Sequence, residues 1–121
     1  LVVSFAPRDG ESRRLVRAWL GPEGIELRAQ SGGDLGMRMA AFFDEALDEA
    51  GEAILVGSDI PGIDRRTVTT AFERLVRHDV VLGPASDGGY WLVGLSRRCP
   101  ELFRGIAWST DRVLAETVAR A

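Results

Sequence analysis

Two carboxylates stand directly after predicted strands, where side chains of an α/β sheet meet ligands. Asp59 lies in "VGSDIPG" (56–62), and Asp87 lies in "SDGG" (86–89). In open α/β sheets, ligands bind beyond the carboxyl ends of the strands. Two acids on adjacent strand ends suit a hard divalent cation such as Mg²⁺, bound together with phosphate oxygens. The alternative is purely structural, with Asp59 as an Asx-turn residue and "SDGG" as a hairpin turn.

A glycine-rich segment, "QSGGDLG" (30–36), precedes the longest predicted helix. The paired glycines Gly32 and Gly33 let a ligand approach the backbone, and a helix start offers free N–H groups. The structural interpretation is a tight turn with Asp34 as the helix N-cap, and taken alone it is the favoured one. Arg38, one turn into the helix, either completes the helix surface or meets a phosphate.

Aromatic residues follow the same loops. Tyr90 and Trp91 point to opposite faces of a predicted strand, so one of them is expected in the core. Gly88 and Gly89 precede them and allow close approach of a ligand. Trp108, in "GIAWSTD", is interpreted as a packing anchor for the last helix, with a rim position over a sugar as the alternative.

The composition narrows the chemistry available to the chain. All fifteen Lys-plus-Arg residues are Arg, so neither a P-loop lysine nor a Schiff-base lysine exists within the 121 residues. One His and one Cys exclude a zinc site built on His and Cys pairs. The net charge of −3, without a basic tract, argues against nucleic-acid binding. No apolar run is long enough to span a membrane. The single cysteine excludes an internal disulfide and fits a reducing compartment, so a cytoplasmic location is expected.

Strands and helices alternate along most of the chain. Strands are predicted at 1–5, 25–30, 52–57, 79–85 and 90–96, helices at 11–20, 32–51, 62–78 and 109–121, and a turn at 21–24. This alternation predicts a single α/β domain over 1–121, with three layers and a mainly parallel sheet. Leu15 and Trp19 are expected on the inner side of the first helix. Asp64 and Ser109 are expected to cap the third and fourth helices.

The order of four segments resembles the DUF2064 family, which is glycosyltransferase-like and belongs to the GT-A superfamily of nucleotide-diphospho-sugar transferases. The segments are "QSGGDLGMRM" (30–39), "GSDIPGI" (57–63), "GPASDGGYWLVGL" (83–95) and "LFRGIAWST" (102–110). The third is the most specific, because so long a string is improbable by chance. The likeness runs from about Leu1 to Ala121.

The resemblance implies a Rossmann-like sheet that binds a nucleotide sugar or a nucleotide, and Mg²⁺ or Mn²⁺ at Asp59, with Asp87 completing the metal site or facing the acceptor. It implies nucleotide contacts in the segments around the glycine-rich helix start and the central strand end, and acceptor-side contacts in the later loops. The nucleotide-binding set is Gln30, Gly32, Gly33, Asp34, Arg38 and Ser58. The acceptor-side set is Gly88, Gly89, Tyr90 and Trp108.

One departure from the family pattern concerns the sheet. The chain begins at what resembles the second strand of the family, so the usual first strand and its phosphate-binding loop are absent from these residues. Loss of a central strand exposes an apolar sheet edge, and self-association through that edge is a prediction.

Three functions follow from these features. The leading one is glycosyl transfer from a nucleotide sugar with a divalent metal and an unidentified acceptor. The second keeps the fold and transfers a nucleotidyl group, releasing pyrophosphate. The third is a non-catalytic remnant that assembles with itself or with a partner.

Overall fold

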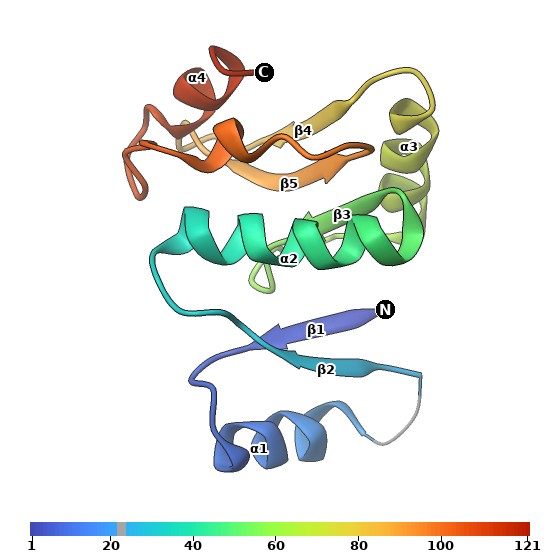
Figure 1. The fold of residues 1–121 in the computed structure, drawn as a ribbon. Coiled ribbons are helices and arrows are strands. Elements are labelled where there is room, and N and C mark those ends of the chain that lie inside the picture. Colours follow the sequence, from blue (N-terminus) through green and yellow to red (C-terminus); the bar gives the residue numbers. More distant parts are fainter. Residues whose placement is uncertain (22–23) are drawn as a thin grey trace.

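Two small sheets form the centre of the chain in a computed structural model, which describes residues 1–21 and 24–121 (Figure 1). Strands β1 (Val2–Phe5) and β2 (Glu26–Ala29) pair in parallel, with Val2 opposite Glu26. The second sheet has the order β3-β5-β4, from β3 (Ala53–Val56), β5 (Tyr90–Leu95) and β4 (Val80–Pro84).

The prediction of a mainly parallel sheet is wrong for this chain. Strand β5 runs antiparallel to both β3 and β4, and only the β1–β2 pair is parallel. The cause is the short link "SDGG" between β4 and β5, because a parallel connection needs a crossover of a dozen or more residues. The α/β class itself agrees with the structure.

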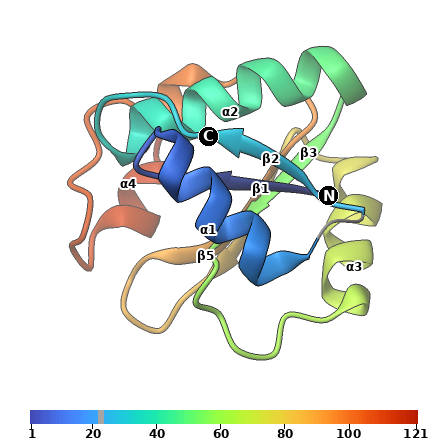
Figure 2. The ribbon, with the colours of Figure 1, turned by 90° about the horizontal axis from the view of Figure 1, so that it is seen from below.

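Helices flank both sheets. The chain carries α1 (Gly10–Leu20), α2 (Leu35–Ala50), α3 (Arg65–Leu75), the 3₁₀ helix η1 (Pro100–Phe103) and α4 (Val113–Val118). Figures 1 and 2 together show α2 on one face of the three-stranded sheet and α3 on the other. Pro22 and Glu23, which belong to the predicted turn at 21–24, lie outside the described residues.

Capping residues fix the helix starts that lead away from the strand ends. The Asp34 carboxylate accepts a 2.8 Å hydrogen bond from the Met37 backbone N–H, and Asp64 accepts one of 2.8 Å from the Thr67 N–H. The bonds from Thr67 hold the pKa of the Asp64 carboxyl below its ordinary value. Both N-cap predictions are confirmed. The predicted cap at Ser109 is wrong, because α4 begins only after Arg112.

The hydrophobic core lies between α2, η1 and the three-stranded sheet. Phe43 of α2 stacks on Phe103 of η1 with ring centroids 5.7 Å apart, and both are buried. Val93 and Leu95 of β5 belong to the same cluster. On the opposite face of β5, Leu75 of α3 packs against Gly94. Because successive residues of a strand point to opposite faces, β5 is covered on both sides.

Helix α1 departs from the sequence prediction. Leu15 and Trp19 are expected inside, yet their relative exposures are 65% and 80%, and α1 has no buried residue. This helix covers only the two-stranded sheet (Figure 2), which offers too little surface for its whole apolar side. Over the described residues, none of the helices is both long and apolar enough to cross a membrane.

Candidate functional site

A cavity of about 1110 Å³ opens where β1 and β3 end and continues between the two sheets. Its lining comes from loops that are far apart in the sequence. Eight of the twelve predicted site residues line it: Gln30, Arg38, Ser58, Asp59, Asp87, Gly89, Tyr90 and Trp108. The other four, Gly32, Gly33, Asp34 and Gly88, do not line it.

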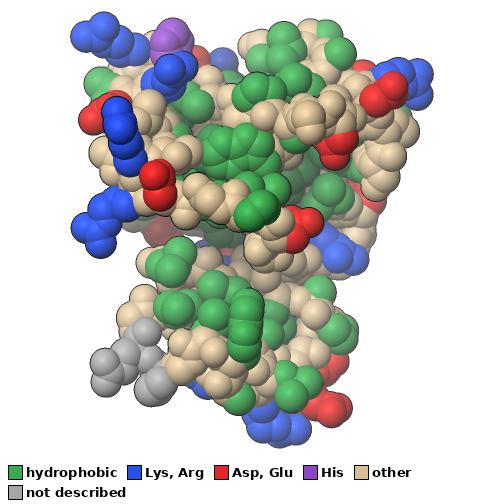
Figure 3. Space-filling view, turned by 180° about the vertical axis from the view of Figure 1, so that it is seen from behind, with side chains coloured by type: hydrophobic (Ala, Val, Ile, Leu, Met, Phe, Trp, Pro, Cys, Tyr) green, Lys and Arg blue, Asp and Glu red, His purple; other side chains and the backbone are tan. Residues whose placement is uncertain are grey.

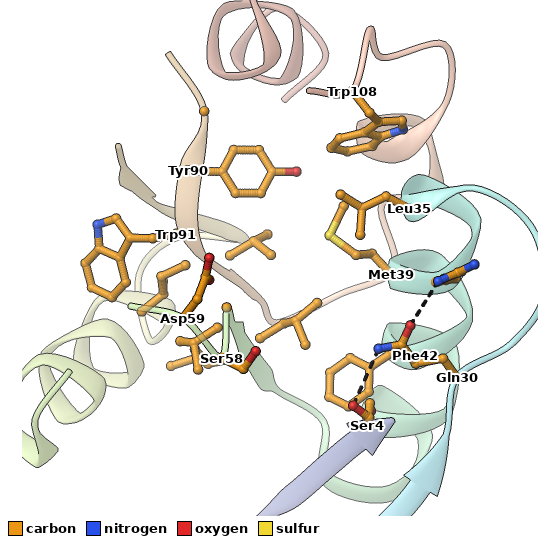
Figure 4. Close-up of a pocket in the computed structure, with 18 of the residues that line it drawn as sticks. Ser4, Gln30, Leu35, Met39, Phe42, Ser58, Asp59, Tyr90, Trp91 and Trp108 are labelled. Atoms are coloured by element: carbon orange, nitrogen blue, oxygen red, sulfur yellow. Dashed lines mark hydrogen bonds between the residues drawn. The ribbon is translucent and has the colours of Figure 1, made fainter. Parts of the chain in front are cut away.

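Asp59 and Ser58 stand at the carboxyl end of β3, and both project into this cavity (Figure 4). An Asx turn requires the aspartate to accept a hydrogen bond from a backbone N–H two residues on. Among residues 1–21 and 24–121, none of the side-chain hydrogen bonds involves the Asp59 carboxylate. The structural interpretation of Asp59 as an Asx-turn residue therefore lacks its hydrogen bond, and the carboxylate is available to a ligand.

Asp87 lies in the hairpin loop between β4 and β5 and is partly engaged. Its Oδ1 accepts a 3.0 Å hydrogen bond from the Gly89 N–H, and the residue lines the cavity. The loop is anchored from the other end of the chain, since the Leu114 N–H donates to the Gly88 carbonyl at 2.9 Å. The segment is therefore a hairpin turn, and Asp87 in that turn also lines the cavity. The two interpretations of "SDGG" do not exclude each other.

Gly88 contributes to this loop through its backbone rather than by contact with the cavity. Its φ is +85°, a left-handed conformation that favours glycine, and a Cβ here would overlap the backbone of Asp111. Asp111 itself lines the cavity. Gly88 thus holds the Asp87 loop against the Asp111 loop.

Arg38, Gln30 and Ser4 form a chain of hydrogen bonds across one wall (Figure 4). The Arg38 guanidinium donates from Nη1 to Gln30 Oε1 at 3.3 Å and from Nε to the Gly33 carbonyl at 2.9 Å. Gln30 Nε2 donates to the Ser4 carbonyl at 3.4 Å, at the end of β1. Gly33, at φ +94°, turns the chain so that its carbonyl reaches Arg38. These contacts orient Arg38 at the rim, with guanidinium N–H groups left for an anion.

Tyr90 and Trp108 form an aromatic wall of the cavity. Figure 4 shows Tyr90 reaching into the cavity and Trp91 pointing to the other side of the strand, as predicted from their alternation. Burial raises the pKa of the Tyr90 phenol, and the neighbouring Thr117 hydroxyl opposes that rise to a smaller extent. Both hydroxyls are buried, and within the described chain neither has a hydrogen-bond partner of good geometry. Tyr90 therefore offers the cavity its ring, whereas its hydroxyl is buried beside Thr117.

Trp108 is held in place by a glycine of α2. A Cβ on Gly36 would lie 2.9 Å from the Trp108 indole, and it would also overlap the Phe103 carbonyl. Only glycine lets this helix turn pass so close to the ring. Trp108 therefore packs against α2, and it also lines the cavity.

Arg8 lines the cavity and was not among the site residues predicted from the sequence. It follows the end of β1, lines the cavity and is exposed, as is Arg38. Neither forms an ion pair within the described part of the chain, whereas Arg28, also on the cavity wall, is paired with Glu26, Glu45 and Glu49. The signal was present in the sequence, because Arg8 follows a strand end by the same rule that identified Asp59.

The Asp59 and Asp87 carboxylates on the cavity suit a divalent cation that is also held by phosphate oxygens and waters. Across residues 1–21 and 24–121, no group of three or more His, Cys, Asp or Glu side chains is arranged to hold a metal by itself. Mg²⁺ in proteins commonly binds through one or two carboxylates, substrate phosphates and waters. Asp59 and Asp87 line one cavity, and this pair of carboxylates suits that shared mode.

Comparison with known proteins gives two findings. The model of a family described as "Uncharacterized protein conserved in bacteria (DUF2064)" matches residues 2–110. A crystal structure of a "putative nucleotide-diphospho-sugar transferase" from Desulfovibrio desulfuricans G20 superposes with a TM-score of 0.90 at 38% identity. The match covers 99% of this chain and 53% of that one, so this chain spans about half of that protein's length. No curated protein matches the chain.

Proposed function

The chain belongs to the DUF2064 family, and from that premise and the cavity we propose that it binds a nucleotide sugar for glycosyl transfer. The observation that carries the proposal is that Asp59, Asp87 and two arginines, which form no ion pair with the described residues, line one cavity beyond the strand ends. The similarity to the Desulfovibrio protein supports the same class of donor.

The charges of the cavity match those of a nucleoside diphosphate. Arg8 and Arg38 supply guanidinium groups, which hydrogen-bond phosphate oxygens in a fork geometry. Asp59 and Asp87 would hold Mg²⁺ or Mn²⁺ together with the diphosphate. Bound there, the metal ion would supply charge neutralisation for the departing nucleoside diphosphate.

The remaining residues are assigned by their position around that diphosphate. Gln30 and Ser58 flank it on the nucleotide side, and Gly32, Gly33 and Asp34 act by shaping the loop that orients Arg38. Tyr90 and Trp108 line the wall on which a sugar or an acceptor would lie, because aromatic faces pack against apolar faces of sugars. Gly88 and Gly89 position Asp87.

Calorimetric titration of the chain with UDP and GDP, with and without Mn²⁺, tests this proposal. We expect binding that strengthens when Mn²⁺ is present, because the cavity lacks a complete metal site until phosphate oxygens arrive. Absence of binding under every condition would contradict the proposal and favour the non-catalytic remnant. With a nucleotide sugar as substrate, release of the free nucleoside diphosphate supports glycosyl transfer, whereas release of pyrophosphate from a nucleotide assigns nucleotidyl transfer.

A further inference from the structure

One part of the cavity has an apolar wall that the proposed nucleotide and metal contacts do not use. Leu35 and Met39 of α2 line it together with two aromatic side chains, Tyr90 of β5 and Trp108 of the loop before α4. Figure 4 shows these four side chains around the same part of the cavity. They come from three segments that are far apart in the sequence, so the wall is a product of the fold.

The polar atoms of both aromatic side chains lie against the protein. The Tyr90 hydroxyl is buried and has no hydrogen-bond partner within the described chain. A Cβ on Gly36 would lie 2.9 Å from Trp108 Nε1, so the N–H edge of the indole lies against α2. Neither Leu35 nor the Met39 thioether adds a strong hydrogen-bonding group. This wall therefore offers a ligand mainly carbon surface.

Leu35 contributes exposed apolar surface to this wall, since its relative exposure is 52%. Exposed apolar side chains also occur elsewhere, as Figure 3 shows for the rear face of the molecule, and single ones need no explanation. Met37, for example, is 60% exposed on the same helix turn and does not line the cavity. Leu35 differs because it shares a cavity wall with two aromatic rings, and contiguous apolar surface in a cavity is typical of a ligand site.

The loop that follows Trp108 supplies polar groups at the border of this wall. Ser109, Thr110 and Asp111 are exposed and line the cavity. Ser109 has φ +63°, a left-handed conformation that is uncommon for residues other than glycine. Such conformations are concentrated at functional sites, where the surrounding structure maintains them. The Asp111 carboxylate can accept a hydrogen bond from a hydroxyl group at this border.

We propose that this part of the cavity binds an aryl alcohol, which combines an apolar aromatic ring with a hydroxyl group. The ring packs on Tyr90 and Trp108, because aromatic pairs attract each other in offset and edge-to-face arrangements. The Met39 sulfur adds a favourable contact with an aromatic ring. The hydroxyl group faces the loop of Asp111. A sugar is disfavoured here, because its hydroxyl groups would lose water against the wall without gaining hydrogen-bond partners.

The role of this alcohol rests on the proposed function, whereas its binding does not. If glycosyl transfer holds, the alcohol is the acceptor. Its hydroxyl oxygen then forms a bond to the anomeric carbon of the sugar, and the bond from that carbon to the diphosphate oxygen breaks. The hydroxyl proton passes to water. The products are the glycoside of the aryl alcohol and the free nucleoside diphosphate.

Nuclear magnetic resonance tests the binding without nucleotide or metal ion. The chain has three Trp residues, and their indole N–H signals are assigned with single Trp→Phe variants. We expect benzyl alcohol to shift the Trp108 signal in a saturable manner. The Trp19 indole, 80% exposed on α1, reports nonspecific binding, and its signal should not move. Methyl glucoside at the same concentrations should leave the Trp108 signal unchanged.

Leu35→Gln tests whether the apolar wall is the binding surface. We expect the dissociation constant of benzyl alcohol to rise about 10-fold, because the ring loses its apolar contact with the leucine side chain. Met37→Gln is the matched control, since it removes a similarly exposed apolar residue of α2 that does not line the cavity. It should keep the native affinity. Both changes are on the surface, and circular dichroism verifies that both variants fold.

Three results would overturn the proposal. They are a Trp108 signal that shows no saturable shift, a response to methyl glucoside as strong as that to benzyl alcohol, and equal affinities of Leu35→Gln and Met37→Gln for benzyl alcohol. Failure of the proposed function gives a different result. A chain that binds benzyl alcohol at Trp108 but binds neither UDP nor GDP would support this site and contradict glycosyl transfer.

Discussion

Replacement of Asp59 by asparagine is expected to remove the Mn²⁺-dependent part of UDP and GDP binding. Asparagine keeps the size of the side chain and lacks the charge that a divalent cation requires. We expect the dissociation constant measured with Mn²⁺ to rise by about 100-fold, equivalent to roughly 2.7 kcal/mol. Binding without metal should change little, because none of the side-chain hydrogen bonds of the described residues involves the Asp59 carboxylate.

The matched control for this change is Glu73→Gln. Glu73 is an exposed carboxylate on α3 and does not line the cavity, so it removes one negative charge elsewhere. It should leave nucleotide affinity and its metal dependence unchanged. Equal affinities for the native chain and Asp59→Asn in the presence of Mn²⁺ would rule out Asp59 as a metal ligand.

Gly88→Ala is expected to cause a large loss of stability for the addition of a single methyl group. The residue combines φ +85° with close contact to the Asp111 backbone, so alanine meets both backbone strain and steric overlap. We expect the free energy of unfolding to fall by about 3 kcal/mol, the sum of the two effects. Urea denaturation followed by circular dichroism measures this loss.

Gly62→Ala separates the two contributions. Gly62 has φ +82°, and nothing lies within 4 Å of a Cβ built on it. Only the conformational cost remains there, so a loss of about 1 kcal/mol is expected. If Gly88→Ala and Gly62→Ala lose equal stability, the contact between the Asp87 loop and the Asp111 loop is not tight, and the proposed role of Gly88 fails.

Local elements were predictable from sequence because their determinants are local. Asp34 and Asp64 lie three residues before the N–H groups that they accept from, and Gly51 ends α2 in the left-handed conformation. Strand direction was not predicted, although the signal existed in the short link between β4 and β5. The predicted burial of Trp19 was wrong for another reason. An amphipathic pattern shows which side of a helix is apolar, but it does not show what covers that side.

The site was predictable where it depends on strand ends. That rule identified Asp59, Ser58 and Asp87, which the fold brings to one cavity, and it would have found Arg8 as well. The roles of Gly36 and Gly88 were not predictable, because the atoms that approach them belong to residues far along the chain. The glycines in the sequence indicated that other atoms can approach the backbone of these segments closely. The structure shows that the approaching atoms belong to the same chain.

The measurement that most directly tests nucleotide and metal binding at this cavity is paramagnetic broadening of backbone amide signals by Mn²⁺ in the presence of UDP or GDP. We predict selective broadening at residues 57–60 and 87–89, which flank the cavity. The amides of the distant segment 74–79, at the end of α3, should stay sharp and serve as the internal reference. Broadening that is absent, or that centres on another part of the chain, would contradict a nucleotide–metal site between Asp59 and Asp87.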